Sequence, residues 1–437
     1  MKMNNKGSKL WQRAKKIIPG GNMLLSKRPE MFLPELWPSY FSKAKGCKVW
    51  DLDGKEYIDM SIMGIGTNTL GYGHDAVDKA VQNVLANGNM STFNCPEEVY
   101  LAEKLVELHP WSDMVRFART GGEANAISIR IARAATGKDN VAICGYHGWH
   151  DWYLSANLSD DENLSSHLLS GLDTNGVPRN LKNTIYPFNY NNFDELKRLV
   201  ETKDIGVIKM EVRRNLQPKD DFLNKVRDIA NKNNIVLIFD ECTSGFRQSY
   251  GGLHKIYNVE PDMAIFGKAL GNGYAITAIL GKREVMEAAQ STFISSTFWT
   301  ERIGPAAALK TLEIMEAGKS WEIITETGLD ITSKWRQLAE SYGLPITTGG
   351  LSALTYFSID SENFLAYKTF ITQEMLKKGY LAANSIYVCT EHQPVVIDGY
   401  FSALDEIFKI IKKCEEGEDI YKLLDGPVCH DTFQRLN

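Results

Sequence analysis

A single lysine stands among glycines in the stretch "PDMAIFGKALGNGY" (261–274). Lys268 directly follows Gly267 and the short apolar run "MAIF" (263–266), so the pattern places it at the end of a buried strand. A lysine in an apolar, glycine-lined position has a lowered pKa, because burial disfavours the charged ammonium. The resulting neutral amine is a nucleophile toward aldehydes.

Two further features stand beside apolar runs of the same region. The run "IVLIFD" (235–240) ends on Asp240, and "RTGGEANAISIR" places Gly121 and Gly122 directly before a helical pattern. An aspartate after a strand is often only a cap, and a Gly-Gly pair is usually only a turn. Two glycines at a helix start also let a phosphate approach the backbone N–H groups. A buried aspartate can keep a pyridine nitrogen protonated.

These features together describe one cofactor site. An amine nucleophile, a phosphate-binding helix start and an acidic partner for a ring nitrogen are what pyridoxal phosphate (PLP) requires of a protein. In a doubly wound sheet, ligands bind outside the carboxyl ends of the strands, and the three features fall there. The sequence therefore predicts a PLP site that includes Lys268 and Asp240.

The elements that must position this site follow from the pattern between about 115 and 290. Short β-rich runs alternate there with helical stretches such as 220–233. Continuous apolar runs separated by helices are typical of a mostly parallel sheet covered on both faces. The predicted strands are "VAIC" (141–144), "GVIKM" (206–210), "IVLIFD" (235–240), "MAIF" (263–266) and "AITAIL" (275–280).

The rest of the chain predicts a smaller α+β domain. A long helical stretch follows residue 310, and "ALTYFSI" (353–359) then reads as a strand before further helices. We expect an N-terminal segment over 1–65 that joins the small domain, a large PLP-binding domain over 66–312, and a C-terminal small domain over 313–437.

Composition narrows the class of protein. The 437 residues carry a net charge of −5, which gives no electrostatic case for nucleic acid or an anionic membrane surface. No apolar run is long enough to span a bilayer, and the basic N-terminal stretch lacks the apolar region of a secretory signal. The seven cysteines are scattered and include no CxxC pair. We interpret them as reduced thiols of a cytoplasmic protein without a zinc site.

The ordered motifs resemble those of the class III PLP-dependent aminotransferases of fold type I, and within them the glutamate-1-semialdehyde aminomutase subgroup. The resemblance covers nearly the whole chain and implies a mostly parallel sheet flanked by helices, with a smaller α+β domain. It also implies a homodimer with shared active sites. Its motifs are "IIPGG" (17–21), "VWDLDGKEYID" (49–59), "TGGEANAISIRIARAATG" (120–137), "YHGWHDWY" (146–153), "IFDECTSGFR" (238–247), "EPDMAIFGKALGNGY" (260–274) and "SSTFWTERIGPAAAL" (295–309).

The resemblance assigns roles to the residues already singled out. Lys268 would form the Schiff base with PLP, and Asp240 would pair with the pyridine nitrogen. Gly121 and Gly122 match the positions whose backbone cradles the phosphate.

It also adds residues that the pattern alone does not identify. Tyr146 would stack on the cofactor ring with His147 beside it, although without the family these two suggest an aromatic core patch. Glu211 matches an acidic residue near the cofactor, but the usual proline after it is Val212 here. Thr297 would reach the phosphate from the neighbouring subunit.

The sequence departs from the aminomutases around the substrate. Their "PGG" is followed by a serine and then an arginine that help to hold the substrate, and these positions fall on Leu24 and near Lys27. Met63 stands near their usual tryptophan. Lys27, Arg28 or His392 could bind an anion instead, although each of them reads more simply as a surface residue. The substrate pocket is therefore expected to differ while the cofactor site is kept.

We expect a PLP-dependent aminotransferase that moves an amino group between an amino donor and a small oxo compound. The nearest alternative is a 2,1-aminomutase, which uses the same residues but needs no external amino donor. A non-catalytic PLP-fold binding subunit would have no reason to keep Lys268. A kinase or dehydrogenase is disfavoured, because the chain has no GxxxxGK[ST] and "GKALGNG" (267–273) puts its lysine before the later glycines, unlike GxGxxG.

Overall fold

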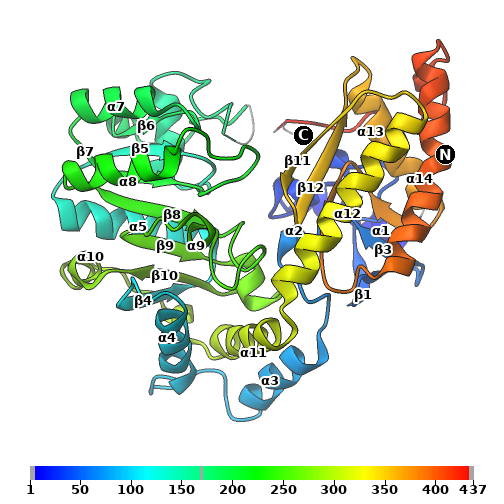
Figure 1. Cartoon of the computed structure of the whole chain (residues 1–437). Helices are drawn as coiled ribbons and strands as arrows, with labels where there is room; N and C mark the ends of the chain where they lie inside the picture. Colours follow the sequence, from blue (N-terminus) through cyan, green and yellow to red (C-terminus); the bar gives the residue numbers. More distant parts are fainter. Residues whose placement is uncertain (1–4, 168–170, 433–437) are drawn as a thin grey trace. The chain divides into compact units, whose positions relative to one another are not determined.

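The computed structural model describes residues 5–167 and 171–432 (Figure 1). The chain divides into two compact units, a large unit of Asp75–Glu322 and a small unit of Met1–His74 with Ile323–Asn437. Residues 1–4 of the expected N-terminal segment lie outside the described residues. No helix in the described ranges combines the length and the apolar character needed to cross a membrane.

The large unit is built on a seven-stranded sheet in the order β4-β10-β9-β8-β7-β5-β6. Five adjacent strands of this sheet pair in parallel, in the order β9-β8-β7-β5-β6. Strand β10 is antiparallel to both of its neighbours, β4 and β9. The bounds are β4 (Met114–Ala118), β5 (Asn140–Cys144), β6 (Ile185–Pro187), β7 (Ile205–Met210), β8 (Val236–Glu241), β9 (Met263–Phe266) and β10 (Thr277–Gly281). The five predicted strands fall in β5, β7, β8, β9 and β10. Two strands were not predicted: β4, which is half-buried, and β6, which has only three residues.

Helices of the large unit pack on this sheet, and α5 is the one that matters most for the site. It lies against β7, β8, β9 and β10 and buries a row of alanine and isoleucine side chains. The helix bounds are α3 (Asp75–Leu85), α4 (Pro96–Leu108), α5 (Gly121–Thr136), α6 (Asp151–Leu154), α7 (Phe193–Thr202), α8 (Phe222–Lys232), α9 (His254–Tyr257), α10 (Arg283–Met286) and α11 (Ile303–Gly318).

Local sequence fixes both ends of α5. Thr120 is the N-cap, and its hydroxyl accepts a hydrogen bond from the backbone N–H of Glu123 at 3.3 Å. The Glu123 carboxylate accepts in return from the backbone N–H of Thr120 at 2.9 Å, which completes a capping box. Gly137 ends the helix in the left-handed region at φ 68°. The helix start is therefore held at a defined place beside the sheet.

The small unit contains two sheets and the helices that cover them. One sheet has the order β1-β2-β3-β13 and the other the order β11-β12-β14. The strand bounds are β1 (Phe41–Lys45), β2 (Lys48–Asp51), β3 (Glu56–Met60), β11 (Ile346–Leu351), β12 (Leu354–Ile359), β13 (Tyr380–Ala382) and β14 (Ser385–Tyr387). The helix bounds are α1 (Lys6–Ile17), α2 (Met63–Gly66), α12 (Ser320–Ser341), α13 (Phe364–Lys377) and α14 (Pro394–Glu415).

Large aromatic side chains make the core of the small unit. Trp335, Tyr367 and Tyr400 come from α12, α13 and α14, and each is fully buried. The indole N–H of Trp335 donates to the hydroxyl of Tyr400 at 3.1 Å, so the polar atoms of both rings are satisfied. Met60 of β3 belongs to the same core, which joins N-terminal and C-terminal segments in one unit.

The large sheet also determines where a site can form. Strands β5, β7, β8 and β9 run parallel, so their carboxyl ends lie at one edge. Asp240 of β8 stands opposite Ile265 of β9, one residue before that strand ends. The residues after these four strands are therefore brought together, as expected for a sheet of this kind.

Candidate active site

Lys268 directly follows β9 and Gly267, at the first position of the 3-10 helix η5 (Lys268–Gly271). Its Nζ donates to the Thr243 hydroxyl at 2.7 Å. Burial lowers the pKa of Lys268 to about 8, so far more of its amine is neutral near neutral pH than in an ordinary lysine. The backbone of Lys268 has φ 43°, a left-handed conformation that costs a non-glycine residue roughly 1–3 kcal/mol. Such strain is typical of residues whose position is set by function.

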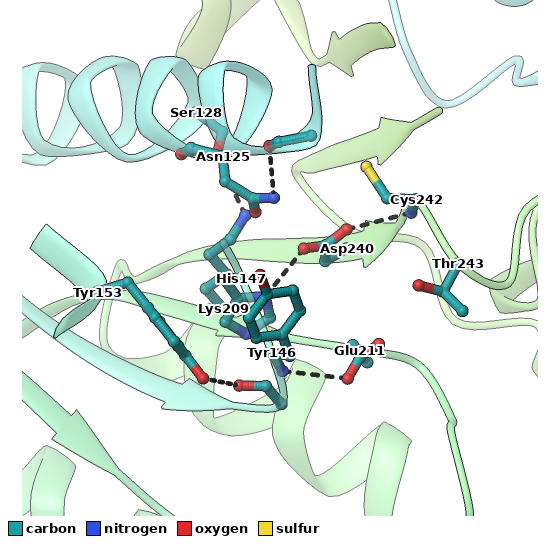
Figure 2. Close-up of polar contacts among 12 residues, drawn as sticks. Asn125, Ser128, Tyr146, His147, Tyr153, Lys209, Glu211, Asp240, Cys242 and Thr243 are labelled. Carbon is teal, nitrogen blue, oxygen red and sulfur yellow. Dashed lines mark hydrogen bonds and ion pairs between the residues drawn. The ribbon is translucent and has the colours of Figure 1, made fainter. Parts of the chain in front are cut away.

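Asp240 lies at the carboxyl end of β8 and is 4% exposed. One carboxylate oxygen accepts from Nδ1 of His147 at 2.9 Å, and the other accepts from the backbone N–H of Cys242 at 3.1 Å (Figure 2). Burial acts to raise the pKa of Asp240, but the hydrogen bond from His147 and the charge of Lys209 outweigh it and hold the pKa below its usual range. The side chain is therefore a carboxylate. It can accept about four hydrogen bonds, more than these two donors supply.

His147 is a neutral donor to this carboxylate. It is fully buried after β5, and burial lowers the pKa of its imidazole to about 4. An ionised aspartate can only accept, so the imidazole proton lies on Nδ1. Its Nε2 atom has no hydrogen-bond partner within the described residues. His147 thus orients Asp240 without neutralising it.

The start of α5 lies beside the end of β8. A side chain at Gly121 would meet only the Sγ of Cys242, at 3.7 Å, and Cys242 in turn donates its N–H to Asp240. At Gly122 a Cβ would come within 2.8 Å of the His150 ring, so a larger residue there would require that ring to move. The first N–H groups of a helix have no partners inside the helix. They form a site for an anionic group such as a phosphate.

Tyr146 and Glu211 come from the loops after β5 and β7. The buried carboxylate of Glu211 accepts from the backbone N–H of Tyr146 at 3.2 Å (Figure 2). It also forms an ion pair with Arg214 at 2.9 Å. Burial raises the pKa of Glu211, and Arg214 opposes that effect. The ring of Tyr146 packs edge-on against Tyr153 with centroids 5.9 Å apart.

Thr297 is a predicted site residue whose place at the site the contacts do not test. It is exposed at the first position of the 3-10 helix η7 (Thr297–Thr300), and its carbonyl accepts from the Thr300 hydroxyl at 2.8 Å. Within residues 5–167 and 171–432, no hydrogen bond links its side chain to the other predicted residues. Its expected role across a subunit interface stays a prediction.

The sequence analysis did not identify Lys209, although its strand lies next to that of Asp240 in the sheet. It is fully buried on β7, and its Nζ donates to the Ser128 hydroxyl of α5 at 3.2 Å. The register pairs Lys209 with Ile238, two residues before Asp240, so both charged side chains lie on the face that α5 covers. Burial lowers the pKa of Lys209 to about 8. A lysine inside the apolar run "GVIKM" was the signal that could have identified it.

The residues present fit PLP. An amine with a lowered pKa suits an aldehyde, a buried carboxylate with spare acceptor capacity suits a protonated ring nitrogen, and a glycine helix start suits a phosphate. Lys268, Asp240 and Gly121 supply these three groups from one edge of the sheet.

Glu241 follows Asp240 directly but belongs to a different network. Successive residues of a strand point to opposite faces, and Glu241 is fully buried on the other side from Asp240. Its carboxylate accepts from the Ser244 hydroxyl at 2.6 Å, the Leu253 N–H at 2.8 Å, and both the N–H and Nδ1 of His254 at 3.0 and 2.8 Å. This arrangement fixes the loop after β8 and is structural.

Replacing Glu241 by alanine is expected to lower the free energy of unfolding by about 3–5 kcal/mol, because four buried donors lose their acceptor. Burial acts to raise the pKa of Glu241, but the contacts from His254 and Ser244 hold it below its usual value. The stabilisation is therefore complete above the pKa of the unfolded chain, near 4, and is lost as the pH falls through the lower folded value. Urea unfolding at pH 7 measures the effect. Exposed Glu201→Ala is the control, and a loss under 1 kcal/mol in Glu241→Ala would contradict the assignment.

Comparison with protein families gives a match over most of the chain. The model of the class-III aminotransferase family matches residues 35–385. The 3-aminobutyryl-CoA aminotransferase of Cloacimonas acidaminovorans is 34% identical over 92% of this chain and 97% of that protein. The glutamate-1-semialdehyde 2,1-aminomutase of Methanocaldococcus jannaschii is 31% identical over 93% of this chain and 98% of that protein.

Solved structures match the fold over nearly its full length. The PLP internal aldimine form of the FumI protein of a Sphingopyxis species matches with a TM-score of 0.84 and 22% identity, over 96% of this chain and 99% of that one. An omega-transaminase from Sphaerobacter thermophilus matches with a TM-score of 0.82 and 23% identity, over 93% and 98%. These matches confirm the predicted fold, that of the PLP-dependent transferases of fold type I.

Proposed function

The chain belongs to the class-III aminotransferases, whose cofactor is PLP, and we propose that Lys268 and Asp240 carry its transfer of an amino group from an amino donor to an oxo compound. When bound, PLP supplies an aldehyde that takes up the amino group and a ring that withdraws electrons from the substrate carbon. The observation that carries the proposal is that Lys268, whose pKa is lowered to about 8, and the ionised Asp240 stand at the ends of the adjacent strands β9 and β8.

Lys268 is the proton carrier of this proposal. With a pKa of about 8, its Nζ is mainly ammonium at neutral pH but keeps a minor share of neutral amine that an ordinary lysine lacks. A group with that pKa can take a proton from the substrate carbon and return it at the next position. Thr243 accepts a hydrogen bond from Nζ and so directs it.

The other residues of the site hold and orient the cofactor. Asp240 keeps a proton on the ring nitrogen, and His147 fixes the direction of its carboxylate. The N–H groups of Gly121 and Gly122 would hold the phosphate at the positive end of α5. Tyr146 would stand beside the ring.

A panel of single substrates tests the proposal and separates it from its alternatives. An aminotransferase changes the absorbance of the cofactor when an amino donor is added alone, and an oxo acid reverses the change. An aminomutase turns over one substrate with no separate donor. A binding subunit without catalysis changes absorbance with none of the compounds, which would sink the proposal.

The proposal extends to a cytoplasmic homodimer with shared sites. The seven cysteines, all within the described residues, are free thiols, which suits a reducing compartment. The segment around Thr297 exposes Phe293 and Phe298, which are 89% and 69% exposed. Large exposed aromatic side chains of this kind favour a protein partner. A second copy of this chain is the partner proposed here, because Thr297 would then reach the phosphate of the other subunit.

Mixing two defective variants, one at Thr297 and one at Lys268, tests whether the active site is shared between subunits. Thr297→Ala is expected to weaken PLP retention, and Lys268→Ala is expected to abolish transfer. In a mixed dimer one site collects both defects and the other collects neither, so activity returns to about a quarter of wild type for random two-fold mixing. Verified mixed dimers that remain no more active than the parents would show that Thr297 does not act across the interface.

A further inference from the structure

We propose that Lys209 shares the charge of Asp240 with the ring nitrogen of the cofactor, and so limits how firmly that nitrogen holds its proton. The inference rests on the proposed function, in which Asp240 faces the ring nitrogen. It adds to that site a positioning residue, which acts through Asp240 and touches neither the substrate nor the cofactor.

Lys209 carries a charge that its hydrogen bond does not balance. The side chain is fully buried, and its Nζ donates to the Ser128 hydroxyl of α5 at 3.2 Å (Figure 2). An ammonium has three N–H donors, and this is its one hydrogen bond within residues 5–167 and 171–432. The Ser128 hydroxyl is neutral, so it satisfies a donor without compensating the charge. Burying an ammonium is costly unless an opposite charge lies near it.

Asp240 is the carboxylate in position to balance this charge. Strands β7 and β8 are parallel neighbours, and Lys209 pairs with Ile238, two residues before Asp240. The two side chains therefore point to the same face of the sheet. Neighbouring strands lie about 4.8 Å apart and each residue advances about 3.3 Å, which separates the two Cα atoms by roughly 8 Å. Across such a distance, two buried charges still interact strongly.

The pKa values of the two groups agree with this geometry. Burial lowers the pKa of Lys209 to about 8, and the charge of Asp240 is the main influence that opposes burial. Lys209 is therefore mainly an ammonium at pH 7. His147 adds no positive charge there, because burial lowers the pKa of its imidazole to about 4. Asp240 thus faces one cation, Lys209, before any cofactor binds.

A protonated ring nitrogen would be a second cation beside the same carboxylate. Lys209 and the ring would repel each other, and each would receive only part of the stabilisation that Asp240 could give to one of them. The charge of Lys209 therefore lowers the proton affinity of the ring nitrogen. With Lys209 removed, Asp240 would hold the ring proton more firmly.

A purely structural role for Lys209 predicts a different result. In that case Lys209 only ties β7 to α5 through Ser128. Its replacement would then change the free energy of unfolding, but it would leave the contact between Asp240 and the ring nitrogen as it was. The test therefore has to measure that contact by itself.

The test compares two ligands of the cofactor-free protein: PLP and its carbocyclic analogue, in which a C–H group replaces the ring nitrogen. Calorimetry at pH 7 gives the ratio of their affinities. Because the ligands differ only at that atom, a change of the ratio between variants reports on the environment of the ring nitrogen. Lys209→Met and Lys209→Gln both remove the charge, one with an apolar and one with a polar side chain, so a folding failure of either leaves the other.

Two further variants serve as controls. Lys282→Met also removes a lysine, but Gly281 pairs with Met263 at the start of β9, so Lys282 stands at the opposite edge of the sheet. Asp240→Asn shows whether Asp240 faces the ring nitrogen at all. Nitrogen NMR of the loaded protein, with PLP labelled at its ring nitrogen, provides a spectroscopic readout of the ring proton.

The preference for PLP over the analogue is expected to rise about 10-fold in both Lys209 variants, which corresponds to one pKa unit of the ring nitrogen. The NMR signal should move toward the protonated position in the same variants. Lys282→Met should match the wild type, and Asp240→Asn should lower the preference.

Two outcomes would overturn the inference in distinguishable ways. An unchanged or lower preference in the folded Lys209 variants, with the expected loss in Asp240→Asn, would refute the role of Lys209 alone. A wild-type preference in Asp240→Asn would show that Asp240 does not face the ring nitrogen. The proposed function would then fail at Asp240, and the role of Lys209 would fail with it.

Discussion

Lys268→Ala is expected to lower the rate of amino transfer by several orders of magnitude, because it removes both the covalent partner of the cofactor and the proposed proton carrier. PLP should still bind weakly, since the helix start at Gly121 and the carboxylate of Asp240 are untouched. Stopped-flow absorbance after addition of an amino donor measures the loss.

Borohydride reduction of the PLP-loaded wild type gives the direct control. The cofactor should remain attached to the peptide that contains Lys268. The label would contradict the assignment if it appeared on Lys209, the other buried lysine near Asp240, or on the surface-facing Lys282. Lys209→Met is therefore the matched variant, and it should keep the label on Lys268.

The lowered pKa of Lys268 also predicts how the rate of PLP uptake depends on pH. Only the neutral amine attacks an aldehyde, so uptake of PLP by the cofactor-free protein should accelerate as the pH rises through about 8 and level off above it. An ordinary lysine would show that rise near 10.4.

The residues of the proposed cofactor site could be singled out from the sequence because of one rule of parallel sheets. Residues that follow parallel strands meet at one edge, so Asp240 after one apolar run and Lys268 after the next could be placed together without coordinates. The glycines before α5 added the phosphate site through the same logic of strand, turn and helix. The antiparallel strand β10 did not disturb this prediction, because it lies on the other side of β9.

The neighbours of these residues could not be placed from the sequence. Asp240 and Glu241 are adjacent acids at one strand end, and only the alternation of faces separates the proposed cofactor ligand from a structural carboxylate. Lys209 looked like an interruption in an apolar run, because its burial depends on Ser128 from a helix some 80 positions earlier. Arg214 required the folded path of the loop after β7. Each of these depends on contacts between distant segments, which spacing alone does not give.

Asp240→Asn is expected to reduce the rate of amino transfer about 100-fold or more. A charge-assisted hydrogen bond contributes about 1.5–3 kcal/mol, which corresponds to roughly 10- to 150-fold, and the loss of ring protonation adds to this. The change is nearly isosteric, so the protein should fold. Both carboxylate oxygens accept hydrogen bonds, from His147 and from Cys242, so an amide NH2 must face one donor. We therefore also expect a loss of about 1–3 kcal/mol in stability.

A matched aspartate separates these two effects. Asp262 is also buried, and it pairs with Arg227 and Lys282 at 2.9 Å, away from the cofactor residues. Asp262→Asn should lose stability through its unpaired cations but keep its rate of transfer. If Asp240→Asn turned over at a near-normal rate while Asp262→Asn showed the expected loss of stability, the carboxylate would not hold the ring proton. A large loss of rate in Asp240→Asn alone would assign that role to Asp240, because the two variants share the same chemical change and differ only in what the carboxylate faces.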